Sequence, residues 1–529
     1  MTADLIVTNA RVATMDGARS THEAVAVTGG RIAAVGGARE IGELRGAATR
    51  VIDAEGGMVL PGFQDAHCHL GESGYQMSLC DLSESGGADA HPAAIAAYAA
   101  AHSDRPVVAG GGWAMSDYPG GVPTREALDA IVSDRPALLY SRDYHSAWVN
   151  TAALEAAGIT RDTPDPAGGR IEHDADGNPA GTLQESAIAL AASLIPEPDA
   201  EERVAGLLAA QRYYHSLGIT ACQDALVRQD WQETYERLAA SGELVLRVRA
   251  NLDWDAERDE SQLAELVERR TSGRVGRLDC GSVKFFSDGV VESRTANMLE
   301  PYLDEQGRST GEDGVEQYAP ADLIRFVGLC DAEGFDVHIH TIGDRAVRES
   351  LDAFAFAVAT NGSRDARHQL AHVEFVHDDD LPRLRTLGVI SNVTPLWAHR
   401  DPYITDMTIP IVTERAAPLV FGSDWSVSTP DPLYQLAVAV GRFLPGGDPE
   451  PLDPTQSLDL TTAIACQTIA AAHAARLERE TGSIEPGKLA DLVVLDRDLY
   501  ELEPAGYPDA RVLMTISEGA VVHAADGWA

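Results

Sequence analysis

The sequence predicts an α/β protein whose main domain is a (β/α)8 TIM-like barrel, accompanied by a small β-sandwich. Short apolar runs alternate with Ala- and Leu-rich helical stretches through the middle of the chain, which is typical of parallel strands joined by helices. No such run is followed by the GxGxxG turn of dinucleotide-binding sheets, which favours a barrel over a doubly wound sheet. The length of 529 residues also exceeds that of one ordinary domain, so we expect an accessory domain.

The two ends of the chain have the sequence pattern of a β-domain. Residues 1–58 consist of short apolar runs punctuated by glycines, and residues 479–529 repeat this pattern. Chain termini often lie close together, so we expect both segments to build one β-sandwich. The barrel is then expected at residues 59–478.

Eight apolar runs have the character of buried barrel strands. In chain order they are VLPGFQDAHCHL, GITACQDAL, VLRVRANL, GSVKFFSDG, FDVHIHTIG, HQLAHVEF, GVISNVTP and PLVFGSDW. The stretch from about residue 71 to 215 separates the first two runs and is too long for one crossover. Because it holds strand-like pieces of its own, PVVAGG and ALLYSRD, we interpret it as an insertion after strand one that forms a lid or a substrate wall.

Charge and composition exclude several classes of partner. Acidic side chains outnumber basic ones by 82 to 41, which gives a net charge of −41, and such a surface repels nucleic acid and anionic membranes. No apolar stretch approaches the ~20 residues of a spanning helix, and the first residues lack the pattern of a secretory signal, so we expect a cytoplasmic protein. The six cysteines form no CxxC pair, which argues against a disulfide framework and a thiolate zinc site.

Only two of the 41 basic residues are lysines, and one of them has an unusual setting. Lys488 lies in the turn EPGKLAD, whereas Lys284 lies inside the apolar run VKFF, where a free ammonium is costly. A neutral amine can take up CO2 and become a carbamate, an anionic ligand able to bridge two cations, which arginine cannot do. The alternative is an unmodified Lys284 that pairs with Asp288 on the same face of the strand.

Ionisable residues gather where the predicted strands end, and barrel active sites are built at that end. His67 and His69 are two residues apart and share one face of the first strand, with Asp65 in phase and Cys68 pointing away. The candidate metal ligands from all strands are His67, His69, Lys284, His340, His372 and Asp424. Imidazole and carboxylate groups suit Zn, Mn, Fe, Co or Ni. Unrelated buried polar residues, each bonded to the backbone, are the alternative, and spacing alone does not choose between His338 and His340.

The chemistry that follows from such a site is hydrolysis. Two bridged cations would lower the pKa of a water molecule between them far enough to supply a nucleophile near neutral pH. Asp424, at the end of the strand PLVFGSD, could accept the proton of that water and deliver it to the leaving group.

The motifs together resemble a known family. They are LPGFQDAHCHL, YHSAWVNTAAL, VKFFSDGVVESRTA, HIHTIGDRAV, AHVEF, GSDW followed by STPDPL, and GSIEPGKLADLVVLD. The chain resembles the amidohydrolase superfamily along its whole length, and within it the amidohydrolase-3 or YtcJ-like group, which includes N-substituted formamide deformylases. This resemblance implies a barrel with a split β-sandwich and one or two divalent transition metal ions, with zinc as the expected ion.

The resemblance also assigns roles to the candidate ligands. His67 and His69 correspond to ligands of the first metal, Lys284 to a carboxylated bridge, His340 and His372 to ligands of the second metal, and Asp424 to the ligand that shuttles the proton. The match of HTIGD to the HxxGD motif of the family chooses His340 over His338. Cys68, between the first two histidines, departs from the family pattern but faces away from the expected metals.

The resemblance suggests substrate contacts as well. In this group the insertion supplies the pocket, so Trp113, His145, Trp148 and Asn150 are candidates for lining it, and packing or capping is the alternative for each. Asp288 and Arg294 could orient the substrate or pair with each other. Asp344 is expected to fix the loop after His340.

The leading hypothesis is a metal-dependent hydrolase that cleaves the C–N bond of a linear amide, an N-substituted formamide or an N-acyl amine. A mononuclear deaminase or cyclic amidase of the same superfamily is the first alternative, but it needs no lysine carbamate. A non-catalytic metal-binding regulatory protein is the second. We expect a small-molecule substrate, no nucleic acid or membrane partner, and a possible homodimer.

Overall fold

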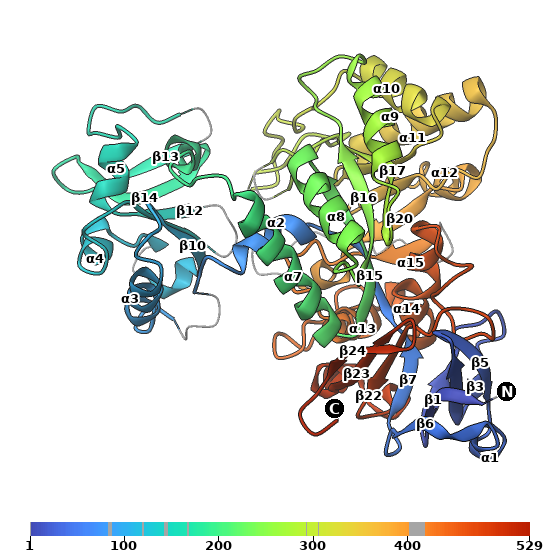
Figure 1. Cartoon of the computed structure of the whole chain (residues 1–529). Coiled ribbons are helices and arrows are strands. Elements are labelled where there is room, and N and C mark those ends of the chain that lie inside the picture. Colours follow the sequence, from blue (N-terminus) through green and yellow to red (C-terminus); the bar gives the residue numbers. More distant parts are fainter. Residues whose placement is uncertain are drawn as a thin grey trace. The chain divides into compact units, whose positions relative to one another are not determined.

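The computed structural model of the chain describes residues 2–528 except 83–86, 119–120, 142–145, 167–168, 292–293, 305 and 401–417. The chain divides into two compact units, Met1–Leu70 together with Gln211–Ala529, and Gly71–Ala210. Figure 1 labels the elements of both units. The first unit holds a barrel and a sandwich, and the second corresponds to the predicted insertion.

The barrel is an eight-stranded parallel sheet in the spatial order β21-β20-β19-β18-β17-β16-β15-β8. Its strands are β8 (Phe63–Cys68), β15 (Ile219–Val227), β16 (Arg247–Asp253), β17 (Leu278–Phe286), β18 (Asp336–Thr341), β19 (Gln369–His372), β20 (Ile390–Val393) and β21 (Leu419–Phe421). A parallel bridge between Cys68 and Trp425 joins the two outer strands and nearly closes the barrel. Each strand overlaps one of the eight predicted apolar runs, and β15, β16 and β17 extend beyond their runs by one to three residues. The predicted fold class is therefore confirmed.

Helices connect the barrel strands, and their sequences explain where they pack. They are α7 (Ala200–Ser216), α8 (Gln229–Ser241), α9 (Gln262–Ser272), α10 (Pro320–Ala332), α11 (Asp344–Asn361), α12 (Leu381–Leu387), α13 (Pro432–Gly441), α14 (Leu460–Cys466) and α15 (Ile469–Ala474). In α8, for example, Trp231, Tyr235 and Leu238 recur at helical spacing and are buried. The helix ends at Gly242, whose φ of 79° is left-handed and therefore suits glycine.

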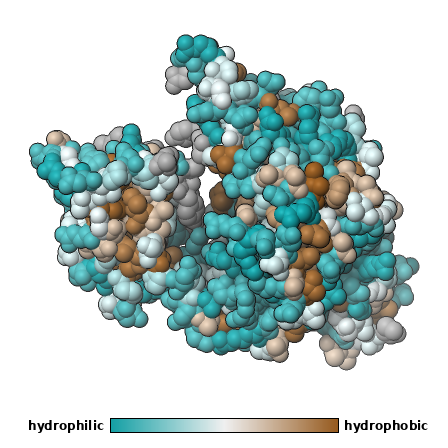
Figure 2. Space-filling view, turned by 90° about the horizontal axis from the view of Figure 1, so that it is seen from above, coloured by the Kyte–Doolittle hydropathy of each residue, from teal (hydrophilic) through white to brown (hydrophobic). Residues whose placement is uncertain are grey.

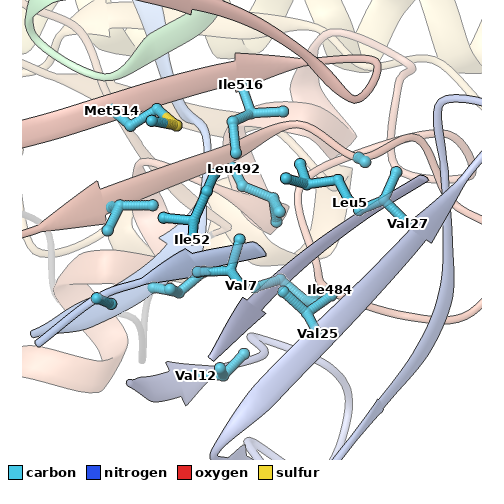
Figure 3. Packing of buried hydrophobic residues seen from close by; sticks show 14 of the residues in the cluster. Leu5, Val7, Val12, Val25, Val27, Ile52, Ile484, Leu492, Met514 and Ile516 are labelled. Carbon is cyan, nitrogen blue, oxygen red and sulfur yellow. The ribbon is translucent and has the colours of Figure 1, made fainter. Parts of the chain in front are cut away.

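The β-sandwich combines strands from both ends of the chain, as predicted. One sheet has the order β5-β4-β1-β6, and the other has the order β24-β23-β22-β7-β2-β3. The elements are β1 (Ala3–Thr8), β2 (Arg11–Ala13), β3 (Thr21–His22), β4 (Ala24–Thr28), β5 (Arg31–Gly36), α1 (Ala38–Gly42), β6 (Arg45–Asp53), β7 (Met58–Pro61), β22 (Leu492–Leu495), β23 (Val512–Ser517) and β24 (Ala520–Ala524). Figure 3 shows Leu5 and Val7 packed in one buried cluster with Leu492, Met514 and Ile516. The two chain ends therefore share one hydrophobic core.

The smaller unit is built on a six-stranded sheet in the order β13-β14-β12-β11-β10-β9. Its elements are α2 (Leu70–Gln76), β9 (Cys80–Asp81), α3 (His91–Ala101), β10 (Val108–Trp113), α4 (Arg125–Asp129), β11 (Ala137–Ser141), β12 (Ser146–Val149), α5 (Thr151–Ala156), β13 (Gly169–His173), β14 (Pro179–Glu185) and α6 (Ala189–Ala192). The predicted pieces PVVAGG and ALLYSRD supply β10 and β11. The unit has hydrophobic clusters of its own on both sides of this sheet.

The face of the molecule drawn in Figure 2 is largely polar, with scattered apolar patches. All six cysteines are buried and free. Among the described helices, none has the length and apolar character that crossing a bilayer requires.

Candidate metal centre

The carboxyl ends of the barrel strands bring three metal-binding side chains together. One nitrogen of His67, one of His372 and one carboxylate oxygen of Asp424 all lie within 4.8 Å of one another, and all three residues are buried. Oδ1 of Asp424 is 3.5 Å from Nε2 of His67 and 3.2 Å from Nε2 of His69. Three strands, β8, β19 and β21, therefore contribute to one cluster.

The other two predicted ligands lie on β17 and β18 beside this cluster. The ring centroid of His340 is 4.6 Å from that of His372. Lys284 is 1% exposed, and its Nζ atom has no hydrogen-bond partner within the described part of the chain. That atom lies 4.7 Å from the ring centroid of Phe286, not in a pair with Asp288. The structure thus collects all six predicted ligands at one end of the barrel.

The backbone at this end of the barrel places two candidate ligands at left-handed φ values and brings two strands close together. His372 and Asp424 have φ values of 74° and 53°, a region that side chains other than glycine rarely adopt, and such conformations cluster at functional sites. Gly422 permits the close approach of β21 to β8, because a Cβ atom on it would lie 2.3 Å from Cβ of His67. The main chain then ties the two segments together, since the N–H of Asp424 donates to the carbonyl of His67 at 2.8 Å.

The imidazoles are held in the neutral form that metal binding requires. Burial lowers the pKa of His67 and of His372 well below the usual value. Burial, with Lys284 nearby, lowers the pKa of His340 to about 4. These histidines therefore carry free lone pairs near neutral pH.

Asp424 and Lys284 have the complementary protonation states. Burial alone would raise the pKa of Asp424, but the hydrogen bond with His69 and the nearby His372 outweigh burial and hold this pKa well below its usual value. Burial lowers the pKa of Lys284 to about 7, although Asp424 opposes this effect. A sizeable share of the amine is thus neutral at neutral pH. The centre thus combines an ionised carboxylate, neutral imidazoles and buried nitrogens that have no hydrogen-bond partner in the described segments, and this set fits a site for divalent cations.

Two hydrogen bonds orient the imidazole rings. Nε2 of His340 lies 3.1 Å from the carbonyl oxygen of Gly289, so this nitrogen donates and Nδ1 is left for a metal. Nδ1 of His67 lies 2.8 Å from Nε2 of His338, which leaves Nε2 of His67 on the side of Asp424. The HIH segment thus contains one candidate ligand, His340, and one histidine that contacts a ligand.

Asp288 organises the loop after β18 and has little surface for a substrate. It is 2% exposed, and its carboxylate accepts backbone N–H groups from Gly343 at 2.8 Å, Asn297 at 3.0 Å and Ile342 at 3.1 Å. Burial raises its pKa to about 7 despite these bonds. Of the two roles considered for Asp288 and Arg294, the mutual pair is absent from the described contacts, and the Arg294 guanidinium lies 3.7 Å from Glu312.

The loop after His340 is also held at its other end. The carboxylate of Asp344 accepts the backbone N–H of Leu299 at 2.8 Å, in line with the expected loop-fixing role. Gly343 packs against Asn297 so closely that a Cβ atom would lie 2.0 Å from the Asn297 carbonyl oxygen. The GD pair of HTIGD is therefore explained by loop packing.

The candidate pocket residues of the insertion pack within their own unit. Trp113 is fully buried, and its indole N–H donates to the carbonyl of Leu139 at 2.8 Å. The indole of Trp148 donates to the carbonyl of Thr124 at 2.8 Å. Asn150 caps α5 by accepting the N–H of Ala153 at 2.9 Å. For these three residues the packing or capping alternative describes what the structure shows, and His145 lies outside the described residues.

The register between β8 and β15 shifts between Asp65 and Cys68. Asp65 lies on β8 but is not one of the three metal-binding side chains of the cluster. Its carboxylate instead accepts hydrogen bonds from the hydroxyls of Ser423 at 2.6 Å and Tyr214 at 3.0 Å. Burial raises its pKa to about 6. Asp65 braces the strand that carries His67 through these bonds, and no sequence pattern marks them.

Two aromatic side chains beside the centre were missed by sequence reasoning. Trp397, in the 3-10 turn Pro395–Trp397 after β20, stacks on His372 with a centroid distance of 5.0 Å. The ring of Phe286 lies 5.5 Å from that of His340. The position of Phe286, two residues beyond Lys284 on the same strand face, is a signal that could have indicated it.

Known proteins similar to this chain indicate the same kind of site as the geometry does. A family model described as "Amidohydrolase family" matches residues 50–523. The chain belongs to the amidohydrolase family. It is accordingly a hydrolase of the metal-dependent amidohydrolase superfamily, as its motifs predicted.

Several relatives cover nearly the whole of this amidohydrolase. It is 30% identical over 526 residues to the protein LONG AFTER FAR-RED 3 of Arabidopsis thaliana. This alignment covers 94% of the chain and 88% of the relative. It is 28% identical over 548 residues to N-substituted formamide deformylase of Arthrobacter pascens, with 98% of each chain covered. The crystal structure of an uncharacterised metal-dependent hydrolase of Pyrococcus horikoshii shares 25% identity and a TM-score of 0.75, with 94% of this chain and 99% of that chain covered.

Proposed function

We propose that this amidohydrolase cleaves the C–N bond of a linear amide, an N-substituted formamide or an N-acyl amine. The observation that carries the proposal is Lys284, a buried amine beside the imidazoles of the centre that has no hydrogen-bond partner among the residues the structure describes. A mononuclear deaminase or cyclic amidase has no need of this amine. The similarity to N-substituted formamide deformylase supports the same substrate class.

The centre would hold one or two divalent transition metal ions, with zinc as the expected ion. The residues that would hold them are His67, His69, His340, His372, Asp424 and Lys284 in its carboxylated form. A bound ion supplies a Lewis acid for the carbonyl oxygen and lowers the pKa of water. In the carboxylation, Nζ of Lys284 attacks the carbon of CO2, a new N–C bond forms, and the nitrogen releases one proton to solvent. The product is an anionic carbamate with two ligand oxygens.

Asp424 is the residue placed to move protons. It is ionised and 7% exposed, and its Oδ1 atom lies 3.2 Å from Nε2 of His69. The carboxylate would take a proton from the attacking water and give it to the nitrogen of the leaving amine, which otherwise departs as an unstable anion. Phe286 and Trp397, both partly exposed, would border the substrate with apolar surface.

Metal stoichiometry tests the proposal. The protein is purified without chelator and with bicarbonate present, and metals are counted per chain by elemental mass spectrometry. Two transition metal ions per chain, together with turnover of formamides or N-acyl amines, is the expected result. One ion per chain, with turnover only of cyclic amides or aminopurines, would overturn the proposal in favour of a mononuclear deaminase or cyclic amidase. Absence of metal after attempts to reload the protein would overturn it.

A further inference from the structure

The centre contains a histidine that the proposed function does not use. His338, on β18, is fully buried, and its Nε2 atom lies 2.8 Å from Nδ1 of His67. The two rings have a centroid distance of 4.8 Å and an interplanar angle of 53°. His338 and His340 are alternate residues of β18, so both share the face toward the barrel interior. In register, His338 lies opposite Lys284 on β17.

The bond between these rings is the only hydrogen bond that either ring makes within the described part of the chain. Nε2 of His67 and Nδ1 of His338 have no hydrogen-bond partner there. A neutral imidazole carries one ring proton, so two arrangements of the pair exist. If His338 donates, the proton of His67 lies on Nε2, and that nitrogen cannot bind a cation. If His67 donates from Nδ1, its Nε2 lone pair is free on the side of Asp424.

We propose that His338 is a positioning residue that accepts the Nδ1 proton of His67 and so fixes His67 as an Nε2 ligand. Metal-binding histidines commonly donate their second ring nitrogen to an acceptor that orients the ring, and here that acceptor is another imidazole. A neutral acceptor orients His67 without adding negative charge to the centre. This inference rests on the proposed metal centre, but it does not depend on which substrate is cleaved.

Two substitutions separate this role from simple packing. In His338→Gln the amide oxygen reaches the position of Nε2 and accepts the same proton, whereas His338→Phe keeps a ring of similar size without an acceptor. The probe is Co²⁺, titrated into metal-free protein in competition with a chromophoric chelator. We expect Co²⁺ affinity to fall by about 10–100-fold in His338→Phe and to stay within a few-fold of wild type in His338→Gln.

His368 provides a matched control in the same barrel. It is 5% exposed, and its Nδ1 atom accepts the backbone N–H of Val337 at 3.1 Å. His368→Gln and His368→Phe should change the thermal unfolding temperature but leave Co²⁺ affinity unchanged. If His338→Phe does not fold, His338→Asn takes its place, because its amide is too short to reach His67.

A spectroscopic readout tests the tautomer directly. In the ¹H NMR spectrum of the Co²⁺-loaded protein, the Nδ1 proton of His67 should give a shifted, slowly exchanging signal in wild type and in His338→Gln. It should vanish through exchange in His338→Phe. Unchanged Co²⁺ affinity in His338→Phe, or persistence of this signal there, would overturn the inference. A wild-type protein that binds Co²⁺ but hydrolyses no amide contradicts the proposed substrate class alone, whereas failure to bind Co²⁺ overturns the centre and this inference together.

Discussion

At the residue scale, the surroundings of each side chain in the centre set its protonation state. Lys284 loses its hydration in the barrel interior, which lowers its pKa to about 7. Asp424 is equally buried, but His69 and His372 hold it in the ionised form. An amine that is partly neutral and a carboxylate that is charged are the states that carboxylation and proton transfer require.

Lys284→Arg tests the carbamate, because arginine keeps a positive charge but cannot take up CO2. We expect the variant to lose at least one metal ion per chain and its amidase activity. Elemental mass spectrometry and turnover measurements check this, and ¹³C NMR with labelled bicarbonate should show a carbamate signal in wild type only. The control is Lys488→Arg, because Lys488 is the other lysine and its Nζ atom contacts Ser483 and Glu485 in a turn. A fully active Lys284→Arg would refute the carbamate.

Asp424→Asn tests the proton shuttle. The amide keeps an oxygen ligand but cannot accept a proton, so turnover should fall by about 10²–10⁴-fold while one or both metal ions remain. The control is Asp431→Asn, where the side chain caps α13 by accepting the N–H of Leu433 at 2.9 Å and asparagine caps equally well. A near-normal rate for Asp424→Asn would remove this residue from the shuttle role.

At the scale of single elements, buried carboxylates tie strands and loops into place. Asp336 begins β18 and accepts hydrogen bonds from Arg249 of β16 at 2.6 Å and from Arg476 after α15 at 2.7 Å. Asp288 holds three backbone N–H groups of the segments around the HTIGD loop. Each carboxylate joins segments that are distant in the sequence, so its loss should be felt beyond its own strand.

Asp288→Ala should loosen the loop that follows His340. The substitution leaves buried N–H groups unpaired, and each such group costs about 1–3 kcal/mol. We expect a lower thermal unfolding temperature and weaker metal binding, whereas Asp288→Asn, which keeps one acceptor oxygen, should lose less of both. Differential scanning calorimetry and metal titration measure the two effects. Equal behaviour of the Ala and Asn variants would contradict the anchoring role.

Because of Asp336, the free energy of unfolding should decrease as the pH falls below about 4. Burial would raise its pKa, but Arg249, Arg476 and the backbone N–H of Arg367 outweigh burial and hold the pKa well below the usual value. Because the unfolded chain binds this proton near pH 4 and the folded chain does not, the stabilisation is present above about pH 4 and is lost as pH falls.

In thermal unfolding from pH 6 to pH 3, the wild type should therefore lose stability more steeply than Asp336→Asn. The variant should be less stable throughout, by up to about 3–5 kcal/mol, because the buried Arg249 loses the carboxylate at 2.6 Å and keeps the more distant one of Asp279 at 3.4 Å. The exposed pair of Glu260 and Arg325 offers a control, since Glu260→Gln should change little. Parallel pH profiles for wild type and Asp336→Asn would contradict this account.

At the scale of the whole molecule, the sandwich makes the first and last segments of the chain depend on each other. Strand β7 pairs with β22 on one side and with β2 on the other. The buried cluster of the sandwich contains Val7 and Val25 from the start of the chain and Ile484 and Met514 from its end. Removal of either end would expose the apolar face of the other.

Deletion of residues 1–55 should therefore yield an insoluble protein. The truncation removes one whole sheet and leaves strand edges and apolar side chains exposed, which favours aggregation. The soluble fraction after expression and size-exclusion chromatography measure the effect. Co-expression of residues 1–55 as a separate peptide should restore solubility. A monodisperse truncated enzyme would contradict the shared core.

Much of the fold and of the centre could be predicted because the signals are local. A buried strand is apolar over its own length, and a candidate metal ligand at its end is a histidine, lysine or aspartate that interrupts that run. His67, Lys284 and Asp424 were found in this way. The residues whose roles sequence reasoning missed, such as Asp65, depend on contacts with other segments of the chain.

The amino-acid order alone was sufficient for the eight barrel strands, the family and the set of candidate ligands, because each is written in short contiguous motifs. It was not sufficient for the protonated nitrogen of each imidazole, the partner of Asp288 or the role of His338. Those features depend on contacts between segments that are distant in the sequence, such as His67 with His338 and Asp288 with Gly343. They also depend on the register between strands, where a shift of one residue turns a side chain to the other face. Register is set by packing across the whole barrel, so only the folded chain specifies it.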